Sequence, residues 1–574
     1  MNKFFSLIGA LLLGSAAAFA VPAASGVFKL MQPDGTQVEV RMFGDEHFHY
    51  YETTAGELLL RDDAGCLRPA VVTSDGFPEA CGEITGQATP AVLRTELMKA
   101  FSRRVEAEAI ARQGKMKVAP NVIKQKFPTT GTVTGLILVV EYQDVKLTEG
   151  ATIERYTRLC NEAGYKDAAT NGSVLDYFTA QSDGKFTPAF DVFGPITLPH
   201  ERAYYGATDG GLVNQFRDAA MEADKMGLDF SKYDINNDGF VDFLFVIFAG
   251  HGEAQGGPYE SVWPAMQDLT NYVFDYFDGL NLSVAACSCE LKGANGTNLD
   301  GISTICHEFS HILGLADIYD TSNTGFGHGM CHYDIMDIGT YNDNFITPSG
   351  YTAMDKFTLG WITPRTLEAS QTDVTLRPFD ATHESIFLVN PKNPDEYYTL
   401  ENRQQQGWDK GIPGHGLVIS YCHYDKQLWG SNRVNSPTAG YEHVAIVAAD
   451  NVWANNLSDE AGDPFPGTSG NTSFSGSTTP GATWKSSGKA EPVDWAISNI
   501  RESEDGTITF DFTTAAGVGN LTTQGFDLRV EGNSIIAPEG ARVYDISGRA
   551  TGCSNLPGGV YIVRLGGKSV KIAL

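Results

Sequence analysis

Two hydrophobic patterns alternate through the middle of this chain. Residues 136–142 and 243–250 are unbroken apolar runs, which are typical of central strands buried on both faces of a sheet. Apolar side chains recur at helical spacing in three further stretches, residues 152–163, 173–181 and 211–226. Strands and helices that alternate in this way predict a central domain of the α+β class that leans toward α/β. We place this domain at residues 129–370.

The flanking segments have a different pattern, richer in β-strands. Short stretches early in the chain alternate polar and apolar side chains, and residues 92–113 have the spacing of a helix. A lysine-bearing linker with a proline follows at 115–126, so we interpret residues 21–128 as a pro-region with a cleavable end. After the central domain, short strands between Gly and Pro turns predict β-sandwich-type modules at 371–513 and 514–574. We therefore expect a multidomain protein.

The first residues have the features of a secretory signal peptide. Lys3 precedes an apolar stretch, and Ala18-Phe19-Ala20 fits the small-x-small cleavage pattern, so we place the cut after Ala20. The alternative is a membrane span, but the stretch is short for a bilayer and is diluted by Gly and Ser. We expect residues 1–20 to be removed and the mature protein to be secreted or held at the cell surface.

The charge of the chain excludes some classes of partner, and its cysteines allow disulfides. The 41 Lys and Arg against 70 Asp and Glu give a formal net charge of −29, which repels phosphate backbones and anionic membranes. We therefore expect no nucleic-acid partner. Export permits disulfides among the nine cysteines. Cys66–Cys81 and Cys306–Cys331 are candidate pairs by proximity in sequence, although spacing alone does not determine connectivity.

The clearest candidate for chemistry is the motif H-E-x-x-H at residues 307–311. On a helix, His307 and His311 lie on one face, so both imidazoles can hold one zinc ion. The intervening Glu308 can take a proton from a water molecule on that ion. The motif therefore predicts a zinc site with Glu308 as the general base.

The residues that follow supply a third ligand. Gly314 can end the helix with a positive φ, so the chain can turn and bring Asp317 to the metal. Asp320 is the alternative ligand, but its offset fits less well. The pattern is the metzincin layout H-E-x-x-H-x-x-G-x-x-ligand, with Asp in place of the usual His. A downstream methionine, Met336, fits the Met-turn of that layout and is expected to form an apolar floor under the zinc.

Two further side chains near the Met-turn are weaker candidates. Tyr341 could donate a hydrogen bond to the oxyanion of the reaction. Its loose spacing favours the alternative of an ordinary core or surface tyrosine. His332 has the best claim to a site role among the remaining histidines, but we assign it no metal.

A second candidate metal site lies at residues 234–242. Oxygen-bearing side chains stand at positions 1, 3, 5 and 9 of an EF-hand-like calcium loop, with Gly at position 6: Asp234, Asn236, Asp238 and Asp242. Position 12 should be Glu and is Phe245, so a calcium ion would need a donor from elsewhere. The alternative is an Asx-rich turn before the buried strand.

Taken together, these motifs make the chain resemble the immune inhibitor A family of secreted metzincin-clan metallopeptidases. The zinc motif from His307 to Tyr319 and the Met-turn at 334–337 carry the resemblance. Stretches on either side also resemble the family: residues 172–178, 193–195, 401–403, 407–409 and 413–414. The resemblance covers roughly residues 131–512 and is weaker in the pro-region. It implies a metzincin-like catalytic domain, a catalytic zinc and the use of calcium.

The end of the chain resembles the C-terminal sorting domain of the type IX secretion system. Three stretches carry this resemblance, residues 543–549, 556–561 and 568–574. It implies passage through an outer membrane and contact with its secretion machinery. The alternative is an ordinary small β-sandwich that binds a ligand or caps the chain.

Our hypothesis is a secreted zinc endopeptidase that hydrolyses extracellular proteins or peptides and is made as a zymogen. Either a carboxylate or Cys66 could occupy the position of the zinc-bound water in the latent form. The main alternative is a non-enzymatic adhesin or glycan-binding protein on a protease scaffold, and a third reading is a zinc hydrolase of esters or small amides. The presence of Glu308 favours an enzyme, because a degenerate scaffold commonly loses this residue. The sequence leaves cleavage specificity and oligomeric state open.

Overall fold

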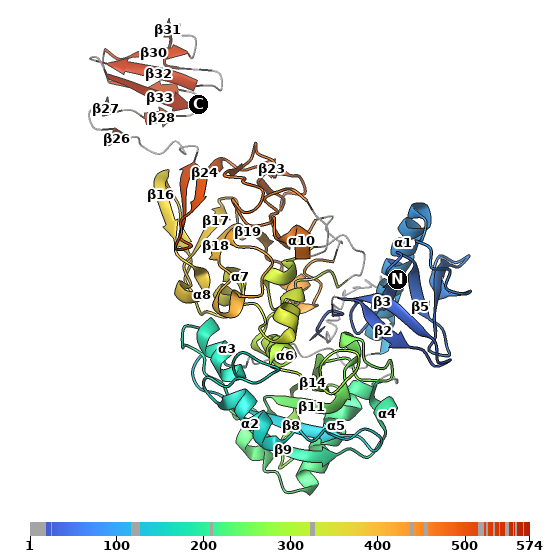
Figure 1. Cartoon of the computed structure of the whole chain (residues 1–574). Helices are drawn as coiled ribbons and strands as arrows, with labels where there is room; N and C mark the ends of the chain where they lie inside the picture. The colour runs from blue at the N-terminus through green and yellow to red at the C-terminus, as the bar shows by residue number, and fades with distance from the viewer. Residues whose placement is uncertain are drawn as a thin grey trace, which may run out of the picture.

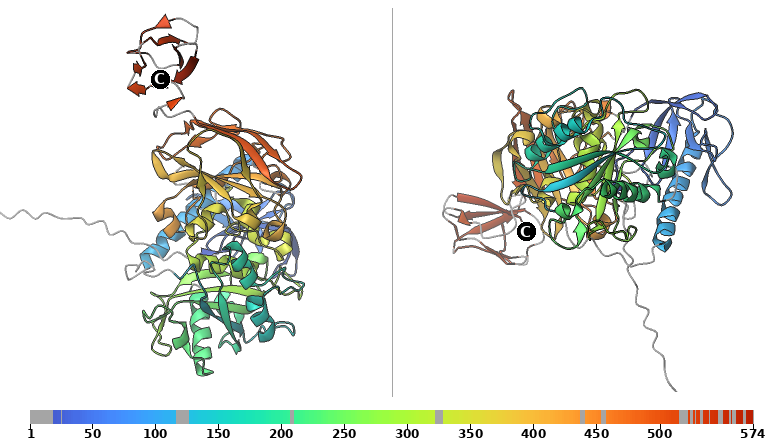
Figure 2. Two further views of the ribbon diagram at one scale, coloured as in Figure 1. Left: turned by 90° about the vertical axis from the view of Figure 1, so that its left-hand side faces the viewer. Right: turned by 90° about the horizontal axis from the view of Figure 1, so that it is seen from below.

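The computed structural model describes residues 19–24, 26–115, 127–206, 210–321, 328–436, 441–452 and 457–514, and most of 522–573. The expected signal peptide, apart from Phe19 and Ala20, lies outside these residues, as does the linker at 116–126. Many sheets and few helices form a mixed α/β multidomain protein (Figure 1). A second view shows the pro-region and the C-terminal module on opposite sides of the molecule (Figure 2).

The predicted pro-region is an antiparallel sheet with one long helix. Each strand pairs with the next in sequence: β2 (Phe28–Met31), β3 (Gln37–Gly44), β4 (His49–Thr53), β5 (Leu58–Arg61), β6 (Leu67–Val72) and β7 (Pro78–Ala80). The helix α1 (Ala91–Lys115) packs on this sheet through Leu97 and Phe101, which share a small core with Tyr50 and Leu58. The helix predicted at 92–113 is therefore confirmed.

The predicted catalytic domain is built on a six-stranded sheet, here named the catalytic sheet, in the order β1-β12-β14-β11-β8-β9. Four of the strands run parallel to their neighbours: β8 (Thr134–Glu141), β9 (Ala189–Thr197), β11 (Leu244–His251) and β14 (Val284–Leu291). The strand β12 (Ala265–Asp268) is antiparallel to β14 and also pairs with the short β1 (Phe19–Ala20). The N-terminal end of the described chain therefore forms the edge of the catalytic sheet.

Helices cover both faces of this sheet, because alternate residues of the central strands point to opposite sides. Leu136 lies in one core with Phe216 of α5 (Gly211–Lys225), and Ile137 lies in another core with Phe309. The second core is lined by α2 (Ile153–Asn161), α3 (Val174–Gln181) and α6 (Ser303–Leu313). The two apolar runs are central strands, as the sequence predicted.

Two further sheets form the β-rich part after the catalytic sheet. The first has the order β15-β17-β18-β19-β20: β15 (Arg365–Thr366), β17 (Ser385–Asn390), β18 (Asn393–Arg403), β19 (Gly416–His423) and β20 (Val444–Ile446). The second has the order β16-β25-β24-β21: β16 (Gln371–Leu376), β25 (Ile508–Thr514), β24 (Trp495–Glu502) and β21 (Phe474–Ser475). Ile386 and Leu400 pack in a core with Ile497 of the second sheet, whereas Phe387 and Tyr397 join the core under the catalytic sheet. The first sheet is thus buried on both faces and fixes the β-rich part to the catalytic part.

A buried ion network lies at this junction. Arg403 is fully buried and donates two hydrogen bonds of 2.6 Å to the carboxylate of Asp409. It also approaches Glu401 at 3.3 Å and donates to the carbonyl of Gly350 at 3.2 Å. Buried charges are costly unless paired, so this network requires the two parts to stay in register.

The C-terminal module has a small sheet of its own in the order β31-β30-β32-β33: β31 (Ala550–Thr551), β30 (Arg542–Asp545), β32 (Val560–Leu565) and β33 (Lys568–Ala573). All nine cysteines lie in described residues and are free thiols, so the candidate pairs Cys66–Cys81 and Cys306–Cys331 are not disulfides. No helix in the described part of the chain is long and apolar enough to cross a membrane.

Candidate active site

The candidate site is built on α6, whose side chains are all buried. His307 and His311 lie one turn apart on the same face of this helix. Gly314 follows with a φ of 103°, and its N–H donates to the carbonyl of His311 at 2.9 Å. A left-handed conformation of this kind favours glycine, so Gly314 ends the helix and turns the chain toward the two imidazoles.

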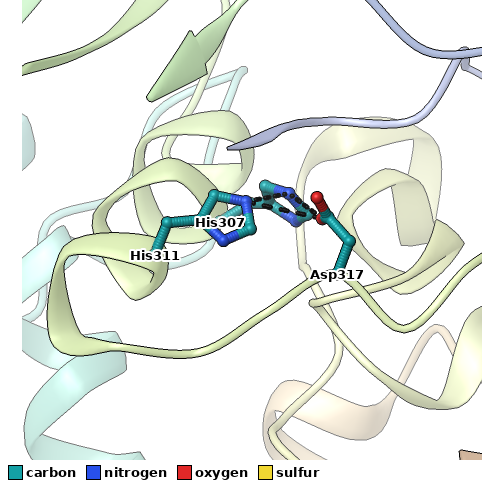
Figure 3. Close-up of side chains that lie close together, drawn as sticks. All are labelled: His307, His311 and Asp317. Atoms are coloured by element: carbon teal, nitrogen blue, oxygen red, sulfur yellow. Dashed lines mark hydrogen bonds and ion pairs between the residues drawn. The ribbon is translucent and has the colours of Figure 1, made fainter. Parts of the chain in front are cut away.

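Three potential ligand atoms converge beside the helix (Figure 3). Oδ1 of Asp317 lies 3.2 Å from Nε2 of His307 and 3.4 Å from Nε2 of His311. The two Nε2 atoms are 3.2 Å apart. Within the described residues this is the one group of three or more His, Cys, Asp or Glu whose ligand atoms all lie within 4.8 Å of one another. The group includes Asp317 and not its rival Asp320.

The outer hydrogen bonds of these side chains determine which atoms carry lone pairs. Nδ1 of His307 contacts the carbonyl of Ile335 at 2.7 Å, and Nδ1 of His311 contacts the carbonyl of Leu315 at 3.0 Å. Because a carbonyl only accepts, each Nδ1 carries the proton and each Nε2 offers a lone pair. Oδ1 of Asp317 has no hydrogen-bond partner. Three lone pairs therefore face one another in a buried space, an arrangement that fits a divalent cation such as zinc.

The electrostatics of the ligands agree with this. Burial lowers the pKa of His307, which favours the neutral, metal-binding form. A carboxylate and neutral imidazoles are the protonation states that bind zinc.

The Met-turn supports the site through its backbone. Met336 is fully buried, and its carbonyl accepts the N–H of Ile318 at 3.0 Å. The neighbouring carbonyl of Ile335 is the one that orients His307. The turn thus holds Ile318, which follows Asp317 in the chain, and it orients the candidate ligand His307 directly.

An asparagine from the β-rich part holds Asp317 from the opposite side. Nδ2 of Asn432 donates to Oδ2 of Asp317 at 2.6 Å, and Oδ1 of Asn432 accepts the backbone N–H of Asp317 at 2.8 Å. Asn432 has a positive φ of 53°. Its side chain occupies Oδ2 and leaves Oδ1 facing the imidazoles. No motif in the sequence pointed to this residue.

Glu308 lies next to the ligands with one oxygen engaged. Oε1 accepts the backbone N–H of Val21 at 2.9 Å, whereas Oε2 has no hydrogen-bond partner. Burial, together with the negative charge of Asp317, raises the pKa of the Glu308 carboxyl well above its usual range. A raised pKa makes the carboxylate a stronger proton acceptor.

The segment that reaches Glu308 crosses the site in extended form, and Figure 3 shows it in blue above the three ligands. Phe19 and Ala20 pair with Met266 and Ala265 of β12. The next residue, Val21, meets Glu308. Its backbone therefore follows the edge of the catalytic sheet into the site.

Side-chain donors bind the backbone carbonyls of this segment where its strand ends. The hydroxyl of Tyr319 donates to the carbonyl of Ala20 at 2.7 Å. Nε1 of Trp263 donates to the carbonyl of Val21 at 2.9 Å, and the hydroxyl of Tyr341 donates to the carbonyl of Pro22 at 2.6 Å. The structure thus places Tyr341 near the site. The carbonyl that it contacts, that of Pro22, lies two residues after the carbonyl that Tyr319 contacts. Sequence reasoning gave no role to Tyr319 or Trp263.

The calcium-like loop follows the short 3-10 helix η1 (Phe230–Tyr233) and includes the strand β10 (Phe240–Val241). Both carboxylate oxygens of Asp234 accept backbone N–H groups of the loop, from Asp238 and Gly239, at 3.0 Å. Asp242 accepts from Ile235 and from Asn236. Burial, with the neighbouring carboxylates of Asp238 and Asp234, raises the pKa of Asp242 to about 6. The four predicted residues are brought into one loop, which the oxygens of the three aspartates close by accepting hydrogen bonds, whereas Oδ1 of Asn236 has no partner.

His332 has a structural contact. Its Nδ1 lies 2.7 Å from Oε2 of Glu460, and both side chains are buried. Glu460 belongs to the short helix α10 (Leu457–Glu460) of the β-rich part. This pair links the loop before the Met-turn to the β-rich part.

A helix-borne His pair, an aspartate and an adjacent glutamate define a metallopeptidase type of site. Residues 147–360 match the family model described as Immune inhibitor A peptidase M6, catalytic domain. The chain is 27% identical over 275 residues to Immune inhibitor A of Bacillus thuringiensis subsp. alesti, an alignment that covers 38% of each protein. It is 24% identical over 305 residues to Pre-pro-metalloprotease PrtV of Vibrio cholerae, which covers 43% of this chain and 33% of PrtV.

The chain thus spans little more than a third of the length of these relatives. Among solved structures, OgpA from Akkermansia muciniphila aligns with 53% of this chain and 76% of its own at 11% identity, with a TM-score of 0.19. A likeness of that size carries no argument. The residues that match this family model, 147–360, include His307, His311 and Asp317.

Proposed function

We propose that this protein is a secreted zinc endopeptidase in which His307, His311 and Asp317 hold the metal. The observation that carries the proposal is the convergence of three unprotonated ligand atoms in a buried space beside Glu308. The names of the relatives, which include a pre-pro-metalloprotease, support the same class. Met336 supports the site through its carbonyl. Protein or peptide substrates follow from the class.

In the proposed reaction, zinc and the side chains of the protein have different roles. Zinc, when bound, lowers the pKa of a water molecule and polarises a carbonyl group. Glu308 accepts a proton from the attacking water through its free Oε2 and returns a proton to the leaving amine. The outer contacts to the carbonyls of Ile335 and Leu315 keep both imidazoles in the ligating tautomer.

Latency is part of the proposal, and the extended segment supports it. The N–H of Val21 donates to one oxygen of Glu308, and the carbonyls of Val21 and Pro22 accept from Trp263 and Tyr341 where a substrate would bind. The pro-region sheet adds contacts at the rim: His49 lies 3.4 Å from Glu253, and its ring is 5.0 Å from that of Trp263. The backbone of this segment, rather than a carboxylate or Cys66, is therefore the group we propose for blocking the site. A cut after Ala20 would leave Val21 as the new N-terminus with its nitrogen at Glu308.

The main alternative is an adhesin or glycan-binding protein on a protease scaffold. A binding scaffold has no need to keep an unpartnered glutamate oxygen beside three free metal ligands. Both features are present, because Oε2 of Glu308 and Oδ1 of Asp317 are buried without a partner. They favour the enzyme.

Hydrolysis of casein or gelatin tests the proposal. The chain from Val21 is assayed before and after limited trypsin, which cuts in the lysine-bearing linker at 116–126. Activity is expected only after processing, and it should vanish in Glu308→Ala and on removal of zinc. No cleavage and no bound zinc after processing would contradict the proposal and favour the binding protein.

We also propose calcium at the loop that contains Asp234, Asn236, Asp238 and Asp242. The crowded carboxylates that raise the pKa of Asp242 support a cation there, although the loop also closes as an Asx turn without one. Isothermal titration with calcium is expected to give one site that Asp238→Ala abolishes. If the calcium titration gives no heat while the protein still binds zinc, the loop is an Asx turn and not a calcium site.

The C-terminal module is proposed to be a sorting domain that contacts outer-membrane secretion machinery. It has a core of its own, with Ile535, Val543, Tyr561 and Val563 buried together, which supports a separate unit. Removal of residues 515–574 is expected to leave the protein inside the cell envelope of its host without loss of peptidase activity. Normal export of the shortened chain would contradict the proposal.

A further inference from the structure

The peptide bond between Ala20 and Val21 lies in the site as a substrate bond would. Its N–H donates to Oε1 of Glu308 at 2.9 Å, and its carbonyl accepts the hydroxyl of Tyr319 at 2.7 Å. In peptide hydrolysis the nitrogen must gain a proton and the carbonyl oxygen must gain negative charge. The general base therefore faces the atom that leaves, and Tyr319 faces the atom that becomes an oxyanion.

The local chain explains why Tyr319 and Asp317 point into the same space. Residues 315–318, which follow Gly314, form neither a helix nor a strand. Ile318 lies between Asp317 and Tyr319 and is buried, and its N–H and carbonyl are held by Met336 and Asn435. Tyr319 is thereby fixed next to the metal ligand by the same backbone anchors.

Tyr319 is also suited to donate a hydrogen bond. It is nine-tenths buried. A buried, oriented donor stabilises developing charge more strongly than water does.

Tyr341 and Trp263 contact different carbonyls. They hold those of Pro22 and Val21, which lie on the leaving-group side of the bond. These carbonyls do not change charge during the reaction, so bonds to them contribute equally to the ground state and the transition state.

We propose that Tyr319 is a catalytic residue that stabilises the oxyanion, and that Trp263 and Tyr341 bind substrate backbone on the leaving-group side. Water attacks the carbonyl carbon and gives a proton to Glu308, while the electron pair of the C=O bond moves to the oxygen that faces Tyr319. The C=O bond then re-forms, the C–N bond breaks, and the amine takes the proton from Glu308. The immediate products are a carboxylic acid and an amine, and transfer of the remaining proton from the acid gives a carboxylate and an ammonium group. This inference rests on the proposed peptidase activity.

Steady-state kinetics of the processed chain on a fluorogenic peptide test the inference. Tyr319→Phe is expected to lower kcat by about 100-fold or more with a nearly unchanged KM, as for loss of one oxyanion donor. Tyr341→Phe, the matched control, is expected to raise KM and leave kcat within about threefold. Both variants should retain one zinc per chain. A phosphinic peptide, which mimics the tetrahedral oxyanion, should lose affinity in Tyr319→Phe in proportion to the loss of kcat/KM.

Three results would overturn the inference. The first is kcat of Tyr319→Phe within threefold of the unsubstituted enzyme. The second is loss of zinc from Tyr319→Phe, which would mean a structural role. The third is equal kcat losses in Tyr319→Phe and Tyr341→Phe. If the unsubstituted, zinc-loaded enzyme cleaves nothing after processing, the proposed peptidase function fails and the inference fails with it.

Discussion

Replacement of Asn432 tests whether the β-rich part helps to hold the metal. Asn432→Gly is the appropriate change, because glycine accepts the φ of 53° and only the side chain is removed. The variant loses the hydrogen bond of 2.6 Å to Oδ2 of Asp317 and the one of 2.8 Å from its backbone N–H. Asp317 is then free to rotate or to bind water, and Oδ1 no longer has a fixed direction toward the imidazoles.

The magnitude follows from the kind of bond. A hydrogen bond to a charged group contributes about 1.5–3 kcal/mol, and loss of an outer partner of a metal ligand typically costs about 10–100-fold in metal affinity. The two figures agree, because a factor of 10 to 100 corresponds to about 1.4–2.7 kcal/mol. We therefore expect the zinc Kd of Asn432→Gly to rise by about 10–100-fold.

Competition with a chromophoric chelator measures that Kd in the processed chain, and circular dichroism checks that the variant folds. Asn499→Gly is a matched control: Asn499 also has a φ of 53° and also donates at 2.6 Å to an aspartate, Asp511, but it is exposed. A zinc Kd for Asn432→Gly within threefold of that of Asn499→Gly would refute the reasoning. The visible spectrum of the cobalt-loaded protein gives a second readout, since a displaced Asp317 would change it.

Three further predictions concern stability and thiol chemistry. Arg403→Met leaves buried carboxylates without their partner and should cost about 3–5 kcal/mol, a fall in Tm of roughly 6–20 °C by calorimetry, whereas the exposed Arg377→Met should leave Tm nearly unchanged. Burial raises the pKa of Asp337 to about 8, so the folded state keeps a proton that the unfolded state releases near pH 4. The contribution of this carboxyl group to stability is therefore complete below pH 4 and is lost as pH rises through 8. Asp337→Asn should accordingly flatten the fall in Tm measured between pH 5 and 8, and an unchanged slope would contradict this. A thiol reagent should react fast with the exposed Cys81 and Cys553 alone, and reductant should leave Tm unchanged, because the remaining thiols are buried and unpaired.

The sequence predicted the parts of the site that depend on local geometry. The spacing of His307 and His311 needs only a helix, and the position of Asp317 needs only a glycine that ends it. The central strands could be predicted because a strand buried on both faces must be continuously apolar. These features depend on residues close together in the chain.

The parts that the sequence did not reveal depend on contacts over long separations. Asn432 meets Asp317 only because the first sheet of the β-rich part packs on the catalytic core. Val21 meets Glu308 only because β1 joins the edge of the catalytic sheet. Tyr319 lies only two residues after Asp317, so its nearness to that side chain could have been expected. Its spacing did not show that its hydroxyl would meet the carbonyl of Ala20.

These long-range contacts show that the functional unit is larger than the segment with a family match. That segment ends at residue 360, whereas Asn432 holds one proposed ligand and Asn435 anchors the residue beside it, Ile318. Arg403 adds a buried network that loses its compensation if the two parts separate. The catalytic sheet and the first β-rich sheet must therefore fold together before the proposed ligands adopt their arrangement. Metal affinity, rather than core packing alone, then depends on the β-rich part, which explains why this part carries polar side chains at an otherwise apolar interface.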